Sequence, residues 1–315
     1  LSIYAFNDTS KVNQSMGNGK TLQFDNVLSY DFKVANQHSF SVMAGSSALK
    51  SKGSSISGYN WDLRVADLDH AYLSVAQNAN RGNPYMGVSG GPYEDALQSY
   101  FGRLQYNYQE KYLLNLTFRA DGSSKFAEGH RWGYFPSVSA GWVASREDFL
   151  QSMHWLDFLK VRGSWGRVGN QSIPAYRYLS LISFSQASYI FGPTEGANTQ
   201  GAYQSSIGNP DIKWETSEQT NVGFDATVKK RWNINFDYYV KNTKDWLIDI
   251  PVLATSGVSG MWINGGDVTN SGVELAVSYH NTIARSLNYS ISANGAYNKN
   301  KIGNIPTEDH ILHGN

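Results

Sequence analysis

The 315-residue chain contains no cysteine, only 8 prolines and only 17% charged residues. Without thiols it can build neither a disulfide framework nor a thiolate metal site. Basic and acidic residues are equal at 26 each. Nucleic acid is therefore excluded as an expected partner, because phosphate binding needs a surplus of clustered basic residues. No apolar run reaches the roughly 18 residues of a transmembrane helix. We also expect no signal peptide, since the N-terminus lacks a basic region followed by an apolar stretch.

Local signatures of catalysis are missing as well. The seven histidines are scattered without an HExxH pair, so no zinc site is expected. No nucleophile elbow, P-loop or dinucleotide fingerprint occurs, so we predict no enzyme and no cofactor, although a dispersed Ser/His/Asp triad leaves no local trace and stays open. Asp67 and Asp69 could contribute to a calcium site, but without EF-hand spacing a solvated loop is favoured.

The chain is rich in aromatic residues, at 14%, and in glycine, with 30. Over much of the chain, large apolar residues recur at every second position. Between Tyr100 and Gln109, and again between Tyr112 and Asp121, large apolar residues alternate with polar ones around a tight turn at Glu110 and Lys111. This pattern predicts an antiparallel hairpin.

The same alternation predicts about eleven strands in all, including a short one at the start of the chain, and hence an all-β fold. Asp121-Gly122 is interpreted as a turn signal at a strand end, and Asn209-Pro210-Asp211 as the exit from a long loop. The other predicted strands are Leu22–Phe32, Phe40–Ala48, Val138–Ala144, Leu159–Arg167, Val222–Val228, Trp232–Lys241, Val273–Tyr279 and Leu287–Tyr297.

Connection lengths favour a transmembrane antiparallel β-barrel over a soluble sandwich, which alternates in the same way. Short links near 34–38, 110–111, 229–231 and 281–286 alternate with long ones near 9–20, 49–98, 169–211 and 245–268. Outer-membrane barrels combine short periplasmic turns with long external loops in this manner. The link from Arg146 to Phe158 is of medium length and is expected to hold one helical turn.

Aromatic residues bracket the predicted strands. Tyr108 and Tyr112 flank a short turn and Tyr100 lies eight residues away, which corresponds to roughly 20 Å along a tilted strand and approaches the ~25 Å between aromatic girdles. Ordinary cross-strand aromatic pairing is the alternative. Trp132, Trp142 and Trp165 are interpreted as belt or packing residues rather than sugar-stacking platforms.

Six phrases carry a family resemblance. In order they are RADGSSKF at 119–126, RWGYFPSVSAGW at 131–142, KVRGSWGRVGNQ at 160–171, NPDIKWE at 209–215, DYYVKNTKD at 237–245 and NSGVE at 270–274. Together the chain resembles the barrel of the SusC/RagA-like TonB-dependent receptors of the bacterial outer membrane.

The resemblance implies a 22-stranded barrel in the cell outer membrane, plugged by an N-terminal domain and energised by the TonB complex. A SusD-like surface lipoprotein would cap it, and its substrates would be oligosaccharides or peptides. On this interpretation residues 1–315 are part of the barrel, and the plug domain, the TonB-contacting segment and the final strands have no counterpart here. An odd strand number fits this, because bacterial barrels are even-stranded.

The long loops carry aromatic residues among Gly, Ser, Asn and Asp, a composition suited to sugar faces and hydroxyls, although peptide binding or contact with the lipoprotein would use it equally. The candidate substrate-binding residues are Tyr59, Trp61, Tyr85, Tyr93, Tyr176, Tyr178, Tyr189, Trp246 and Trp262.

We therefore expect TonB-dependent outer-membrane import of glycans or peptides, with outer-membrane lipid around the wall. Two alternatives remain: a passive porin-like or adhesin barrel, and a secreted carbohydrate-binding all-β protein. A plug-encoding segment upstream would argue against the first, and recovery in the membrane fraction would argue against the second.

Overall fold

The computed structural model describes residues 10–63, 67–76, 87–184, 188–190, 198–258, 260–283 and 287–305. Contacts divide the chain into two compact units. Unit 1 comprises Leu1–Phe24 and Leu49–Ala96, and unit 2 comprises Asp25–Ala48 and Leu97–Asn315. Within the described ranges no helix is long and apolar enough to cross a membrane.

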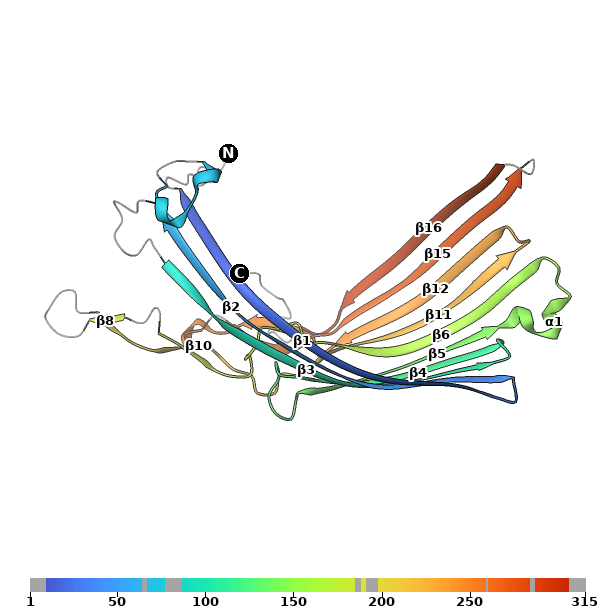
Figure 1. Cartoon of the computed structure of the whole chain (residues 1–315), viewed down its shortest axis with the longest axis horizontal. Helices are drawn as coiled ribbons and strands as arrows, with labels where there is room; N and C mark the ends of the chain where they lie inside the picture. Colours follow the sequence, from blue (N-terminus) through green and yellow to red (C-terminus); the bar gives the residue numbers. More distant parts are fainter. Residues whose placement is uncertain are drawn as a thin grey trace. The chain divides into compact units, whose positions relative to one another are not determined.

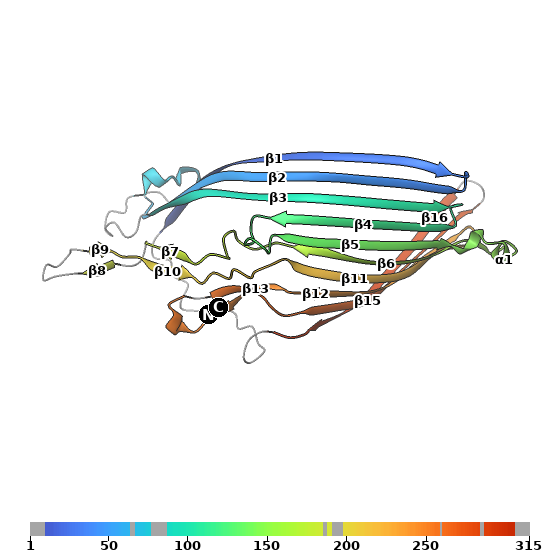
Figure 2. The ribbon, with the colours of Figure 1, turned by 90° about the horizontal axis from the view of Figure 1, so that it is seen from below.

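Ten strands form one sheet in sequence order, and each neighbouring pair from β3 to β16 is antiparallel, as Figures 1 and 2 show for unit 2. This confirms the predicted all-β antiparallel architecture. About eleven strands were predicted, and the short first one falls before residue 10, outside the described residues. The strands are β1 (Lys11–Val34), β2 (His38–Trp61), β3 (Gly87–Tyr108), β4 (Tyr112–Ser123), β5 (Trp132–Val143), β6 (Leu156–Asn170), β11 (Glu215–Val228), β12 (Trp232–Lys244), β15 (Val268–Ile283) and β16 (Leu287–Ile302).

Six short strands form two-stranded ribbons in the long connections of unit 2. They are β7 (Leu181–Ser183) with β10 (Tyr203–Ser206), β8 (Ser188–Ile190) with β9 (Asn198–Gln200), and β13 (Leu247–Pro251) with β14 (Gly260–Asn264). The connection from β5 to β6 holds a 3₁₀ turn at Ala144–Arg146 and the single helical turn α1 (Asp148–Gln151). The helical turn predicted in this link is confirmed. Short 3₁₀ turns at Leu68–His70, Leu73–Val75 and Ala254–Ser256 complete the described elements.

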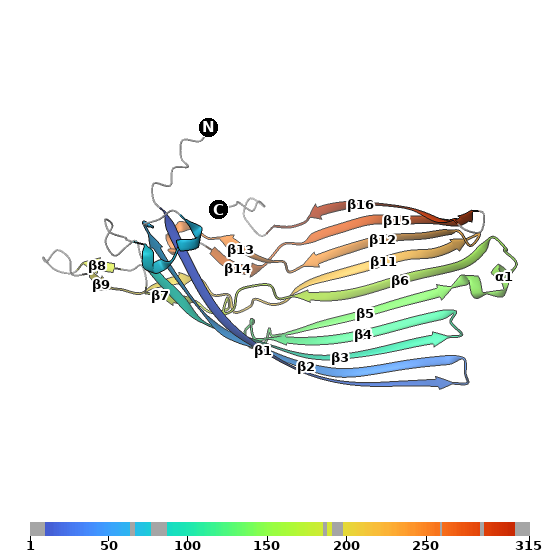
Figure 3. The same ribbon diagram turned by 45° about the horizontal axis from the view of Figure 1, so that its top comes forward.

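The short connections of unit 2 lie at the end of the sheet that carries α1 (Figure 3). The predicted turn after β3 is present: Gln109 and Glu110 both have positive φ, and the Lys111 amide donates to the Tyr108 carbonyl at 2.8 Å. Lys229 and Lys230 repeat this conformation between β11 and β12. Two consecutive left-handed residues define a type I′ turn, whose twist matches that of the strands it joins. We call this the turn end of the sheet and the opposite end the loop end.

Several predicted loops are strands instead. Residues 11–20 belong to β1, residues 49–61 to β2, and residues 87–98 to β3. The links predicted at 9–20 and 49–98 were therefore too long. These stretches are rich in Gly, Ser, Asn and Lys and lack the alternation of large apolar residues. A strand exposed to water on both faces keeps its hydrogen-bond ladder without that alternation.

The interpretation of Asp121-Gly122 as a turn was also wrong. Both residues lie inside β4, where the Asp121 carboxylate accepts from Arg119 Nε at 2.8 and 2.9 Å. The loop reverses later, where Gly129 has a φ of 92°. At Asn209-Pro210-Asp211 the predicted loop exit is confirmed, because these residues lie between β10 and β11. There Asn209 Oδ1 accepts from the Asp211 amide at 3.1 Å.

The sheet of unit 2 has two chemically different faces, which follow from strand alternation and the cross-strand register. The apolar face is exposed in the chain: Phe118 is 51% and Val222 53% exposed. A water-soluble sandwich would cover such a continuous surface. The exposed large residues of the apolar face are Tyr100, Tyr112, Leu116, Phe118, Trp132, Tyr134, Trp142, Val161, Trp165, Val222, Trp232, Tyr238, Val273 and Leu275.

Large buried apolar residues collect at the loop end. Phe126 and Ile212 are 0% exposed, and four neighbours pack around them. We call this group the loop-base core; its residues are Phe126, Phe135, Ile173, Ile212, Trp214 and Leu247.

Candidate functional site

The polar face of unit 2 carries the side chains that alternate with the apolar ones. A hollow of about 760 Å³ lies on this face and reaches from β1 to β11. Asn115, one of its lining residues, has a buried Oδ1 without a hydrogen-bond partner in the described part of the chain. Other polar lining residues are Asp31, Lys33, Gln105, Ser139, Lys160, Arg162, Ser164 and Asn221.

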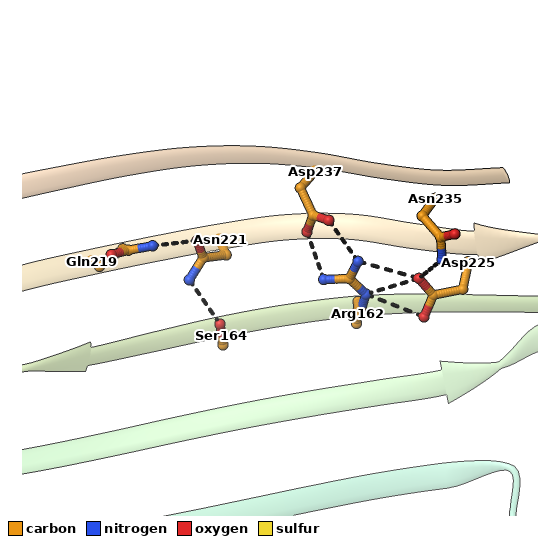
Figure 4. Close-up of polar contacts among 7 residues, drawn as sticks. All are labelled: Arg162, Ser164, Gln219, Asn221, Asp225, Asn235 and Asp237. Carbon is orange, nitrogen blue, oxygen red and sulfur yellow. Dashed lines mark hydrogen bonds and ion pairs between the residues drawn. The ribbon is translucent and has the colours of Figure 1, made fainter. Parts of the chain in front are cut away.

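Arg162 is the centre of an ionic cluster on the polar face (Figure 4). Its two terminal nitrogens donate to the two oxygens of Asp237 at 2.6 and 2.7 Å. Nε and Nη2 reach Asp225 at 3.2 to 3.3 Å, and Asn235 Nδ2 donates to Asp225 Oδ1 at 2.9 Å. The planar fork of a guanidinium fits a carboxylate in this bidentate manner. The cluster is therefore fixed in position before any ligand arrives.

The strand register explains why these residues meet. Arg162 on β6, Gly223 on β11 and Asp237 on β12 occupy one cross-strand row. Because Gly223 has no side chain, Arg162 reaches across β11; a Cβ there would lie 2.6 Å from Asp237 Oδ1.

A neighbouring row toward the loop end is uncharged. Asn221 Nδ2 donates to Ser164 Oγ at 3.1 Å, and Gln219 Nε2 donates to Asn221 Oδ1 at 2.8 Å (Figure 4). Amides and hydroxyls in such an array offer both donors and acceptors to a polar solute. Among the described residues, no group of three His, Asp or Glu side chains could hold a metal ion.

At the turn end of the sheet, the Glu147 side chain links residues of β4 and β5 and of the turn before β4. Its carboxylate accepts from Tyr112 Oη at 2.7 Å, from Trp142 Nε1 at 3.2 Å and from Lys111 Nζ at 3.2 Å. These hydrogen bonds hold the pKa of Glu147 below its ordinary value, because they favour the charged form.

The loop-base core joins the segments that leave the sheet at the loop end. Trp214 Nε1 donates to the Arg131 carbonyl at 2.8 Å, and the buried Glu215 carboxylate accepts from the Leu247 amide at 3.1 Å. Asn264 Nδ2 donates to the carbonyl of Lys213 at 2.9 Å. Three of the quoted sequence phrases, at 119–126, 131–142 and 209–215, supply residues to this region, so much of their pattern reflects packing beneath the loops.

The candidate binding residues of unit 2 have different surroundings in the described part of the chain. Tyr178 and Trp262 pack against the loop-base core, whereas Tyr176 is exposed and has a φ of 65°. Trp246 is half-buried and joins the β13–β14 ribbon through Gly265 and Gly266. Tyr189 lies in β8, and its side chain is outside the described part.

Three candidates belong to unit 1, and Tyr85 lies outside the described residues. Lys11 Nζ sits 4.7 Å from the ring centre of Tyr59 and 5.0 Å from that of Trp61, which is cation–π geometry. Tyr93 is half exposed and lies over Gly19 and Gly53. Asp67 is engaged locally, since Oδ2 contacts His70 Nδ1 at 2.7 Å.

The Arg162 cluster was missed from the sequence. Asp225 and Asp237 alternate with apolar residues, so the pattern assigns them to the polar face. Their meeting with Arg162 depends on the register between β6 and β11, which are separated by a long connection. The sequence signal for this cluster is the pairing of opposite charges on adjacent strands, which emerges only when the strands are aligned in register.

Comparison with known proteins identifies the fold. Residues 2–310 match the family model for the β-barrel of TonB-dependent receptor-like proteins. The chain belongs to this family. TonB-dependent receptors are outer-membrane proteins, so the apolar face contacts lipid and the polar face lines the barrel interior. The secreted alternative is thereby excluded.

Curated relatives share this barrel. TonB-dependent receptor P39 of Formosa agariphila is 29% identical over 96% of this chain and 28% of its own length. TonB-dependent receptor SusC of Bacteroides thetaiotaomicron is 34% identical over 68% of this chain and 22% of its own length. The chain thus spans less than a third of the length of these curated relatives.

A solved structure shows the same arrangement. The RagAB peptide transporter superposes with a TM-score of 0.79 at 26% identity, covering 97% of this chain and 32% of the other. The predicted resemblance to SusC/RagA-like receptors is confirmed.

Proposed function

We propose that the protein imports oligosaccharides or peptides across the outer membrane in a TonB-dependent manner, with a SusD-like surface lipoprotein as its partner. The observation that carries this proposal is the likeness to the RagAB peptide transporter over 97% of the chain. The polar face supports it, because this wall supplies hydrogen-bonding groups to a polar solute. On this proposal the chain contributes wall and loops, while a plug domain and TonB contacts reside in other parts of the receptor.

Substrate contacts are assigned to the candidate aromatic residues, with Tyr59 and Trp61 on β2 and Tyr93 on β3 as the leading group. Aromatic faces accept the C–H faces of sugars or peptide side chains. We expect Trp61→Ala or Tyr93→Ala to weaken substrate binding about tenfold, the loss of one stacking contact. Tyr72→Ala, at an exposed unit 1 tyrosine outside the candidate set, is the matched control. Equal affinity of all variants would overturn this assignment.

The function itself is tested by deleting the gene and measuring uptake of defined glycans and peptides. The proposal expects uptake of one nutrient class to be lost and to return with the complete gene. Deletion of TonB should have the same effect, whereas a passive porin would continue to conduct. Unchanged uptake of every candidate would contradict import.

A further inference from the structure

A groove of about 330 Å³ opens on the apolar face of unit 2 at the loop end of β5, β6, β11 and β12. Register places Trp132, Tyr134, Arg167, Glu218 and Lys244 on the apolar, lipid-facing side. Charged side chains on that side would be costly within the hydrocarbon and are suited to the headgroup level.

The groove exists because β5 and β6 separate. Their register extends only from Val143 to Ser137 and stops beside Pro136, which has no amide hydrogen to donate to a ladder. β6 continues along β11 as far as Asn170. The Phe135 and Trp214 rings fill the space behind the separation, because a Cβ added at Gly133 or Gly169 would meet both rings, Phe135 more closely. A buried indole therefore forms the floor of the groove. One side, or bank, is formed by β5, and the other by β6, β11, β12 and the segment that leads into β11.

One bank is cationic. Arg167 and Lys244 share a single carboxylate, Glu218, with Lys244 Nζ at 3.3 Å. Lys213 Nζ lies 3.2 Å from Asp245. Arg167 and Lys244 carry two positive charges against the single negative charge of Glu218, so this bank has a surplus positive charge. The Lys213 and Lys244 side chains are 50% and 56% exposed, which leaves donors available to a ligand.

The opposite bank is aromatic. Trp132 stacks on Tyr100 with ring centres 5.9 Å apart, and Tyr134 stacks on Phe118 at 6.2 Å. These contacts hold both rings in place while leaving them partly exposed. Exposed aromatic rings facing a cationic bank suit a ligand that combines a ring-like apolar surface with negative charge.

We propose that this groove binds the phosphorylated sugar headgroup of an outer-leaflet glycolipid, with the chemistry of lipid A. Lys213, Lys244 and Arg167 contact the phosphate, and Trp132 and Tyr134 contact the sugar. The long connections are external in outer-membrane barrels, so the groove lies at the level of the outer-leaflet headgroups. Basic side chains gathered at a membrane surface attract lipid phosphates. The assignment depends on outer-membrane placement and is independent of what the receptor transports.

The test uses the receptor extracted from the outer membrane, stripped of lipid in detergent and titrated with lipid A while bound copies are counted by native mass spectrometry. The double variant Lys213→Ala/Lys244→Ala should bind at least about tenfold more weakly. Tyr134→Ala, on the aromatic bank, should show a smaller loss. Lys241→Ala is the matched control, since it removes a lysine from the opposite face of β12 and should leave affinity unchanged. Gel-shift folding assays verify that each variant is a folded barrel.

Two further titrations, with dephosphorylated lipid A and with inorganic phosphate, distinguish a lipid headgroup from free phosphate as the ligand. Dephosphorylated lipid A should bind weakly, and inorganic phosphate should fail to compete at millimolar concentration. Equal binding of phosphorylated and dephosphorylated lipid would overturn the proposal. Competition by inorganic phosphate would show a simple anion site instead and would also overturn it, as would equal affinity of the wild type and the double variant.

Discussion

Gly223 lies between Arg162 and Asp237 in one row of the polar face. A methyl group there would meet the Phe236 carbonyl oxygen and would lie 2.6 Å from Asp237 Oδ1, so it would strain the β12 backbone and push the carboxylate away from the guanidinium. We expect Gly223→Ala to cost about 1–2 kcal/mol of unfolding free energy, since the pair is half-exposed and a charged hydrogen bond is lost. Urea unfolding of the receptor in lipid measures this. Gly295→Ala, whose Cβ would meet nothing within 4 Å, should be nearly neutral; an equal loss in both would contradict the explanation.

Glu147 predicts a pH dependence at the turn end. Its pKa is lowered in the fold by hydrogen bonds from Tyr112, Trp142 and Lys111. The resulting stabilisation is complete above the ordinary carboxyl pKa and is lost as pH falls through the lowered value. The protection factors of the amides at residues 108–112, corrected for the pH dependence of intrinsic exchange, should therefore fall in acid in the wild type. In Glu147→Gln the carboxylate contribution should be absent at every pH; an unchanged acid response in this variant would refute the prediction.

At the scale of elements, the loop-base core carries the loops. Phe126 is fully buried, and replacing a buried Phe by Ala typically costs about 3–5 kcal/mol. We expect Phe126→Ala to expose the β6–β11 and β12–β15 connections to limited proteolysis while the sheet stays folded. Leu253→Ala, at a position 80% exposed, should leave the digestion pattern unchanged. Protection identical to that of the wild type would contradict this role.

The strands of unit 2 could be predicted from sequence because lipid on one side and polar groups on the other impose period two, as in β4 and β12. The extensions of β1 and β2 could not, because they lack alternating large apolar residues although the backbone ladder persists. Contacts between side chains on either side of a long connection could not be predicted from sequence either. Arg162 contacts Asp225 only because of the β6–β11 register. Ile212 packs with Phe126 in the loop-base core only because the loops fold over the end of the sheet.

At the scale of the whole molecule, the two faces predict opposite responses at adjacent positions. Leu116 lies on the apolar face of β4, midway between Tyr112 and Ala120, and Thr117 lies on the polar face. Leu116→Arg should destabilise the receptor by about 2–4 kcal/mol, the cost of a lipid-facing arginine near the membrane centre. Thr117→Arg should cost less, because its face lines the interior. Assembly in the outer membrane and urea unfolding measure both, and a larger loss for Thr117→Arg would reverse the assignment of faces.

The hydrogen-bond ladder between β5 and β6 stops at Ser137, short of the loop end, and this should weaken the wall mechanically. Neighbouring seams are bonded over more of their length: β6 follows β11 from Leu156 to Asn170, whereas the β5–β6 register ends at Ser137. When the receptor is pulled from the membrane by one terminus, strands leave in hairpins. We expect the seam beside Pro136 to yield at a lower force than its neighbours. In single-molecule force spectroscopy, the first rupture within this part of the wall should therefore fall between β5 and β6.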